Sequence, residues 1–223
     1  MIKSVLFFFV TLIVCSLGVF ASLTVNIKPS KIKQGDPFQI SVKSDSEITK
    51  GVVTFLNQEY PLYKITDNKF GFLSGFDLED KEGEYKLKVS IEGKNKKTAE
   101  HEVVINLLER KSKEQRLTLP DNLAVFSEIE VKKIEDENNN LNELFKNQNT
   151  PKYWNNKFLY PLNGRNKNNF GVRRFINGEE RSRHNGVDVG AKCGTKILAP
   201  ASGKVTLCDD FFLAGKGLVI DHG

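Results

Sequence analysis

The sequence contains few cysteines, which limits the part that disulfides can play. Only three are present among 223 residues. Cys15 falls in the apolar N-terminal segment, so Cys193 and Cys208 are the two that a processed chain would retain. In an oxidising compartment this pair permits a single disulfide, and the alternative is two buried, inert thiols.

The sequence also has only one long apolar run, and it lies at the N-terminus. Lys3 provides a short positive region ahead of the apolar stretch Ser4–Leu17. Val19 and Ala21 fit the small-residue pattern before a cleavage point, which predicts a signal peptide over residues 1–21. The alternative is an uncleaved anchor, because about 18 residues is near the lower limit for spanning a bilayer. No second run follows, so we expect an exported protein of the periplasm or extracellular cell envelope, with no membrane attachment after cleavage.

Lys and Arg exceed Asp and Glu by five over the whole chain, and the excess lies at one end. Residues 156–223 contain eleven Lys and Arg against six Asp and Glu, so the remainder of the chain is neutral. A basic segment attracts anionic partners. For an exported protein we expect no nucleic acid as a partner and favour an anionic cell-envelope polymer; the alternative is an ordinary solvated surface.

Short strands are predicted throughout residues 22–107. The segments LTVNIKP and FQISVKS alternate apolar and polar residues, and the turn cluster KQGDP separates them. The same pattern continues in GVVTFLN, KFGFLSGF, GEYKLKVSIEG and AEHEVVINLL. Six or seven strands at this spacing predict an immunoglobulin-like β-sandwich. His101 lies in one of these runs and is expected to be structural.

Residues 108–155 are expected to form a helical, Asn-rich linker. Ser127 and Glu130 match a capping box, the reciprocal pair of hydrogen bonds that begins many helices. Asn138–Asn140 weakens the middle, so the pattern predicts one helix or two short ones. The apolar residues that follow the cap recur at steps of three and four: Ile129, Ile134, Leu141, Leu144 and Phe145.

Residues 156–223 are predicted to form a second domain, again all β. Ten of the 17 glycines fall here, and strand-like runs alternate with tight turns. The fold class expected for the whole chain is therefore mainly β: an N-terminal sandwich, a helical linker and this second domain.

A histidine and an aspartate in the second domain form the pattern His-x-Gly-x-Asp. His184 and Asp188 would share a face of an extended strand. Gly186 between them would leave room on that face for a bound ion. Imidazole and carboxylate are both zinc ligands, and a catalytic zinc takes three protein ligands with one position open. Taken alone the pattern is weak, and the alternative is a surface histidine beside a turn aspartate.

The surrounding motifs resemble those of the lysostaphin/LytM-type zinc endopeptidases of bacterial cell walls. Four motifs match in one order over about 60 residues, and Lys196 departs from a proline of the family. The matching positions are Phe170, Gly171 and Arg173, then His184, Gly186 and Asp188, then Gly194, Thr195, Ile197, Ala199, Gly203 and Val205, and finally Asp221, His222 and Gly223.

The resemblance implies that His184 and Asp188 are the first two ligands of a zinc ion. The family's third ligand belongs to a His-x-His pair further along, and His222 matches a position that is not a ligand. No such pair occurs in this chain, so the resemblance predicts a C-terminally truncated, incomplete peptidase domain. No catalytic residue is assigned within it.

Two functions follow from these motifs. The first is a zinc endopeptidase that cleaves peptide cross-links of bacterial peptidoglycan, inactive as this 223-residue chain. The second is a non-catalytic regulator or binder of cell-wall hydrolases that uses the same fold. Both available ligand residues are intact, which favours the enzyme for a longer protein.

Overall fold

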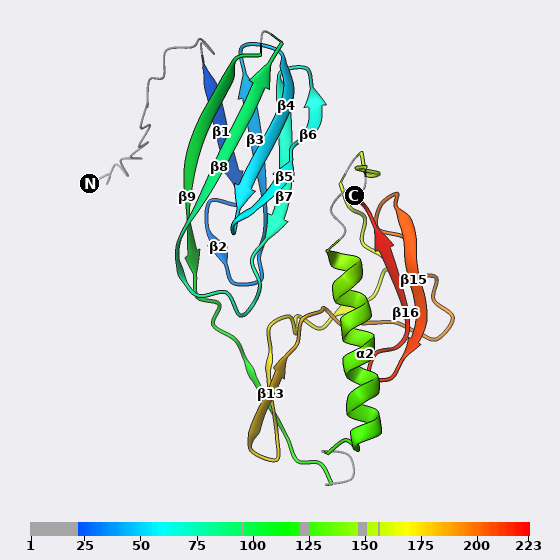
Figure 1. Ribbon diagram of the computed structural model, residues 1–223. Helices are drawn as coiled ribbons and strands as arrows, with labels where there is room; N and C mark the ends of the chain where they lie inside the picture. The colour runs from blue at the N-terminus through cyan, green and yellow to red at the C-terminus, as the bar shows by residue number, and fades with distance from the viewer. Residues whose placement is uncertain (1–21, 95, 121–124, 147–150, 156) are drawn as a thin grey trace, which may run out of the picture. The chain divides into compact units, whose positions relative to one another are not determined.

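The computed structural model describes residues 22–94, 96–120, 125–146, 151–155 and 157–223, and it is mainly β (Figure 1). The predicted signal peptide over residues 1–21 lies outside this range, so export stays a prediction. Among the described residues, no helix combines the length and apolar character needed to cross a membrane.

Two sheets form the immunoglobulin-like sandwich that the alternating pattern predicts. Side chains on β3 alternate between exposed and buried, as expected for a strand with one face on a core. The first sheet, in spatial order, is β1 (Leu23–Lys28), β3 (Pro37–Ser44), β7 (Lys69–Gly75) and β6 (Tyr63–Thr66). The second is β2 (Ile32–Lys33), β9 (Thr98–Leu108), β8 (Gly83–Gly93), β4 (Ile48–Phe55) and β5 (Gln58–Pro61).

The apolar core of the described residues lies entirely in these strands and their loops. Every buried hydrophobic side chain in the described ranges falls between Ile32 and Leu107. Its largest fully buried members are Phe38, Phe55, Ile40, Ile48, Leu87, Ile91 and Leu107. The described residues that follow Leu107 therefore depend on backbone pairing, ion pairs and aromatic contacts.

The capping box is confirmed at the start of α2 (Glu128–Phe145), a single helix of 18 residues. Ser127 Oγ accepts a hydrogen bond from the Glu130 amide at 3.4 Å, and Glu130 Oε2 accepts one from the Ser127 amide at 2.8 Å. Three consecutive asparagines do not break the helix. Glu137 accepts a hydrogen bond from the Phe212 amide on both carboxylate oxygens, at 3.1 Å each. This contact joins α2 to the turn that contains Phe212.

The remaining strands of the described residues form three small sheets. β10 (Glu114–Leu117), β12 (Arg173–Ile176) and β13 (Glu179–Arg183) form one sheet, with β10 and β12 parallel. β11 (Arg165–Asn166) pairs with β14 (Val189–Gly190), and β15 (Lys204–Phe211) pairs with β16 (Gly215–Asp221). Cys193 and Cys208 are both free and exposed, so neither the single disulfide nor the buried pair of thiols is found.

The chain divides into two compact units whose boundaries cut across the sandwich strands. The first contains Ile40–Phe72, Lys86–Val103 and the described residues before Lys28. The second contains Lys28–Gln39, Leu73–Tyr85 and the described residues from Val104 onward. Loops of the sandwich therefore belong to the same unit as the His-x-Gly-x-Asp motif. The domain boundaries expected from the sequence stay a prediction.

Candidate metal site

His184 and Asp188 lie on a loop that leads into a strand, and the segment is not extended, so the two residues do not share a strand face. His184 directly follows β13, and Asp188 directly precedes β14, with a bend at Gly186 between them. The chain must turn here because β13 pairs with β12 and β14 pairs with β11, in a different sheet. The expectation of open space is met, since a Cβ added at Gly186 would have no heavy atom within 4 Å.

The bend brings the two side chains together. His184 Nε2 lies 3.4 Å from Asp188 Oδ1. A direct charge-assisted hydrogen bond would be shorter, at about 2.7–2.9 Å. Two donors at about 2.1 Å from a tetrahedral zinc ion are separated by about 3.4 Å. The 3.4 Å spacing fits two ligands of one ion, and it also lies within the range of an ordinary ion pair.

Asn169 holds both side chains, through three of its own groups. Its side-chain amide donates to Asp188 Oδ2 at 2.7 Å, and its Oδ1 accepts the Asp188 backbone amide at 3.0 Å. Its backbone carbonyl lies 3.1 Å from His184 Nδ1. Asn169 thus fixes the aspartate by its side chain and the histidine by its main chain.

The Asn169 carbonyl also decides which nitrogen of the His184 ring carries a proton. A carbonyl oxygen can only accept, so Nδ1 must be the donor. In neutral imidazole Nε2 then carries the lone pair, and it faces a carboxylate oxygen that is likewise rich in electrons. A cation between the two atoms would turn this repulsion into attraction. The same arrangement, a ligand histidine donating its second nitrogen to a carbonyl, is usual at zinc sites.

The remaining histidines are placed elsewhere. His222 Nδ1 lies 2.9 Å from the Ser202 carbonyl, and its ring packs edge-on against Phe158 at 5.2 Å between centroids. His101 lies within β9, as expected for a structural residue. Over the described ranges, no group of three or more His, Cys, Asp or Glu side chains could hold a metal. The donor set that fits zinc is the pair His184 and Asp188.

Electrostatics keep Asp188 in its ligand form. The hydrogen bond from the Asn169 amide holds the pKa of the Asp188 carboxyl below its usual range, against an opposing effect of burial. The charges of Lys167 and Arg174 lower this pKa further. The carboxylate is therefore charged at neutral pH and available to a cation.

Asn169 was missed by the sequence analysis. It stands one residue before the Phe170–Gly171 motif, in the run Asn166–Lys167–Asn168–Asn169, where nothing in the sequence distinguishes it from its neighbours. The one feature that could have indicated Asn169 is its position directly before the Phe170–Gly171 motif.

Replacing Asn169 with alanine should weaken the aspartate half of the pair. Without the donated hydrogen bond the pKa of Asp188 rises toward its ordinary value, so acidification displaces a metal at a higher pH than in the wild type. We expect zinc affinity to fall by roughly tenfold, as for other residues that hold a ligand. An NMR pH titration of the Asp188 carboxyl measures the change in its pKa, and an NMR titration of the protein with zinc measures the change in affinity. Asn185→Ala is the control, because Asn185 is exposed in the same loop and its side chain makes none of the described hydrogen bonds.

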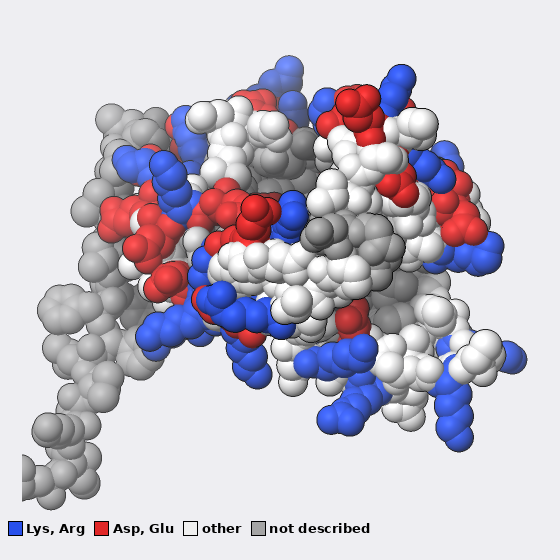
Figure 2. All heavy atoms as spheres, turned by 90° about the horizontal axis from the view of Figure 1, so that it is seen from below, with Lys and Arg blue, Asp and Glu red and all other residues white. Residues whose placement is uncertain are grey.

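Part of the positive charge of residues 156–223 lies beside carboxylates from outside this segment. Arg183 Nε is 3.2 Å from Glu79 Oε1, and Arg173 Nη1 is 3.5 Å from Glu114 Oε1. The face in Figure 2 shows Lys and Arg interspersed with Asp and Glu. An anionic polymer as partner stays a prediction.

Comparison with solved structures agrees with the metallopeptidase motifs at the level of the fold. A crystal structure from Pseudomonas aeruginosa, provisionally named peptidase M23, is similar at a TM-score of 0.58 and 23% identity. The match covers 86% of this chain and 70% of that one. The chain therefore resembles that structure in its fold.

A second structure, the BIgI domain of beta protein from S. agalactiae, covers 40% of this chain and 100% of its own at 17% identity. Its TM-score of 0.25 is too low to carry a conclusion. No protein-family model matches the chain, and no curated protein matches it.

Proposed function

We propose that this chain carries part of the zinc site of an endopeptidase that cleaves peptide cross-links in bacterial peptidoglycan. The observation that supports it most is the pair of His184 Nε2 and Asp188 Oδ1, 3.4 Å apart and oriented by Asn169. The M23-like fold adds to it, since peptidases of that family are generally zinc-dependent. Lysostaphin/LytM-type specificity rests on the motif resemblance alone.

The residues of this chain would hold and orient the ion. His184 would bind the ion through Nε2, since its Nδ1 donates to the Asn169 carbonyl, and Asp188 would offer a carboxylate that Asn169 keeps charged. When bound, zinc acts as a Lewis acid toward an amide carbonyl and lowers the pKa of an attacking water.

Zinc binding can be measured at one histidine at a time, since the chain has only three. We expect the ring signals of His184 to shift on addition of zinc to the 223-residue chain, with weak affinity, while those of His101 and His222 stay in place. An unchanged His184 signal at millimolar zinc would contradict the proposed site.

A second assay separates the two candidate functions. A chain extended by a His-x-His segment should release new amino groups from purified peptidoglycan if the protein is an endopeptidase. The alternative, a regulator or binder of wall hydrolases, predicts co-sedimentation with the wall and no release. Both ligand residues are present and oriented, and for that reason we favour the enzyme.

A further inference from the structure

Two loops of the β-sandwich hold the segments that carry the candidate metal site. We propose that they do so through Arg183 and Arg110, which act as positioning residues; this inference rests on the proposed zinc site. The loops are residues 34–36, between β2 and β3, and residues 77–80, between β7 and β8, here called the sandwich-end loops. They belong to the second compact unit, together with residues 169–188.

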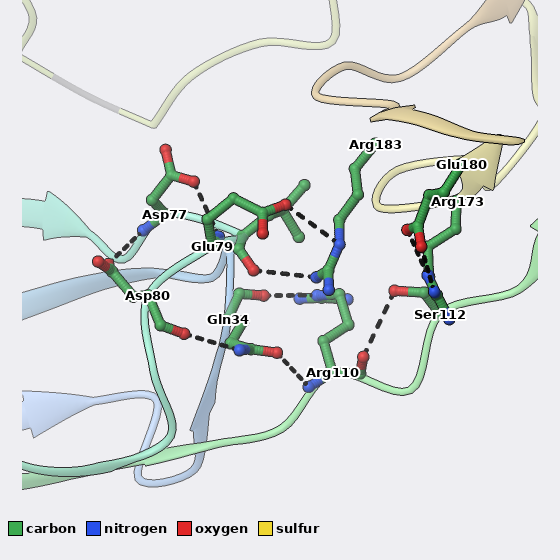
Figure 3. Close-up of polar contacts among 10 residues, drawn as sticks. Gln34, Asp77, Glu79, Asp80, Arg110, Ser112, Arg173, Glu180 and Arg183 are labelled. Carbon is green, nitrogen blue, oxygen red and sulfur yellow. Dashed lines mark hydrogen bonds and ion pairs between the residues drawn. The ribbon is translucent and has the colours of Figure 1, made fainter.

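Arg183, which directly precedes His184, contacts the second of these loops. Its Nη1 donates to the Leu78 carbonyl at 2.9 Å, and its Nε lies 3.2 Å from Glu79 Oε1. The Arg183 side chain is only 23% exposed, whereas that of Glu79 is 71% exposed. The hydrogen bond to the carbonyl is therefore the better shielded of the two contacts. Figure 3 shows the Arg183 guanidinium facing Glu79.

Arg110 connects the first loop with the aromatic ring beside Asn169. Its Nε donates to the Gln34 carbonyl at 2.6 Å, and its backbone amide donates to Gln34 Oε1 at 3.1 Å. Its Nη2 pairs with Asp36. The guanidinium carbon lies 5.3 Å from the centroid of the Phe170 ring, within the range of a cation–π contact.

The sandwich-end loops are also tied to each other. The Gly35 amide donates to the Asp77 carbonyl at 3.2 Å, and Gln34 Nε2 donates to the Asp80 carbonyl at 2.7 Å. A Cβ at Gly35 would lie 2.7 Å from Phe170 Cε1 and 2.8 Å from Leu78 Cδ2. The absence of a side chain at Gly35 is what lets Phe170 approach the loop.

Two backbone hydrogen bonds connect the segment at Phe170 with His184. The Gly171 amide donates to the His184 carbonyl at 2.8 Å, and the His184 amide donates to the Val172 carbonyl at 2.9 Å. Because the described residues after Leu107 contribute no buried hydrophobic side chain, an apolar core does not fix this arrangement. The polar and aromatic contacts to the sandwich-end loops take its place. The loops of the sandwich are thus a structural part of the site.

The test uses the full 223-residue chain and two matched pairs of variants. Arg183→Ala removes the contacts to Leu78 and Glu79. Arg181→Ala is its control: it lies two residues earlier on β13, and its ion pair is with Glu179, outside the sandwich-end loops. Zinc titration on the His184 ring signals gives the affinity, and hydrogen exchange of the Gly171 and His184 amides reports on position without metal.

The second pair acts from the other side of the contact, about 150 residues away in the sequence. Gly35→Ala places a methyl group against Phe170, at a residue whose φ is +75°. Gly83→Ala is its control, because φ there is +140° but no heavy atom lies within 4 Å of the added Cβ. Both substitutions strain the backbone, and only the first disturbs Phe170.

We expect Arg183→Ala and Gly35→Ala each to raise the zinc Kd at His184 by about tenfold, the usual effect of losing support behind a ligand. Both should lose amide protection at Gly171 and His184, while signals from β4 and β8 show that the sandwich stays folded. The two controls should stay within about twofold of the wild type. If Arg183→Ala and Gly35→Ala behave like their controls, the sandwich-end loops do not position the site.

Failure of the underlying function would look different. A wild-type His184 that does not respond to zinc would overturn the proposed zinc site. The positioning role would then be judged from amide protection alone. Protection at Gly171 and His184 that is lost in both variants and kept in both controls supports the role. Protection that is kept in all four proteins overturns it.

Discussion

Leu107→Ala should reduce the free energy of unfolding of the sandwich by roughly 3 kcal/mol, within the range of about 2–5 kcal/mol for buried leucines. Leu107 is 1% exposed and lies near the end of β9. It pairs there with Ile32 of β2, and the two strands are parallel. Truncation removes apolar surface from the core and leaves a cavity that the sheets can fill only in part. Small domains have about 5–15 kcal/mol in total, so the loss would be a large fraction of the stability.

The neighbouring residue provides the control. Leu108 has the same side chain on the same strand, points to the other face and is 36% exposed. Leu108→Ala should cost clearly less, about 1 kcal/mol, since Leu108 keeps 36% of its surface in water and so buries less apolar area than Leu107. Urea unfolding followed by amide signals of β4 and β8 measures both. Equal losses for the two variants would mean that the core does not include β9 as described.

The sandwich could be predicted from sequence because its information is local and periodic. In the runs PFQISVKS and GEYKLKVSIEG, burial follows every second residue with few exceptions. The start of α2 was equally predictable, since a capping box needs only Ser127 and Glu130 at the correct spacing. Neither required knowledge of a distant part of the chain.

The second unit was harder to predict because its arrangement depends on contacts between distant residues. Arg183 and Leu78, 105 positions apart, are joined by one hydrogen bond that no pattern in either segment indicates. The bend between His184 and Asp188 also depends on pairing with two different sheets. The sequence predicts a strand and its lead-in loop for this run, but local pattern cannot predict the bend, because the bend is set by pairing with other segments.

The candidate site itself was predicted in part. The two ligand residues came from a motif, and the structure brings their side chains together at 3.4 Å. Their role as zinc ligands stays a prediction. Asn169 is evident only in the structure, because an asparagine that binds one residue by its side chain and another by its main chain leaves no spacing rule in the sequence.

His184→Ala and Asp188→Ala should each abolish measurable zinc binding by the chain. Complete structural zinc sites bind with an apparent free energy of about 10–16 kcal/mol, so one of four ligands contributes on the order of 2.5–4 kcal/mol, or roughly 60- to 700-fold in Kd. A chain that already binds through two residues would retain one. Equilibrium dialysis against zinc measures the loss directly, and it does not depend on the ring signal that His184→Ala removes.

His222→Ala is the matched control for these variants. It removes the same imidazole and a hydrogen bond to the Ser202 carbonyl, but its ring packs on Phe158 and the described structure gives it no acidic partner. Zinc binding should therefore be unchanged. Asp188→Asn is the sharper companion, because the amide keeps the shape of the side chain while the charge that attracts the cation is lost. Zinc retained in Asp188→Asn and lost in His222→Ala would place the metal at His222 and refute the site described around Asn169.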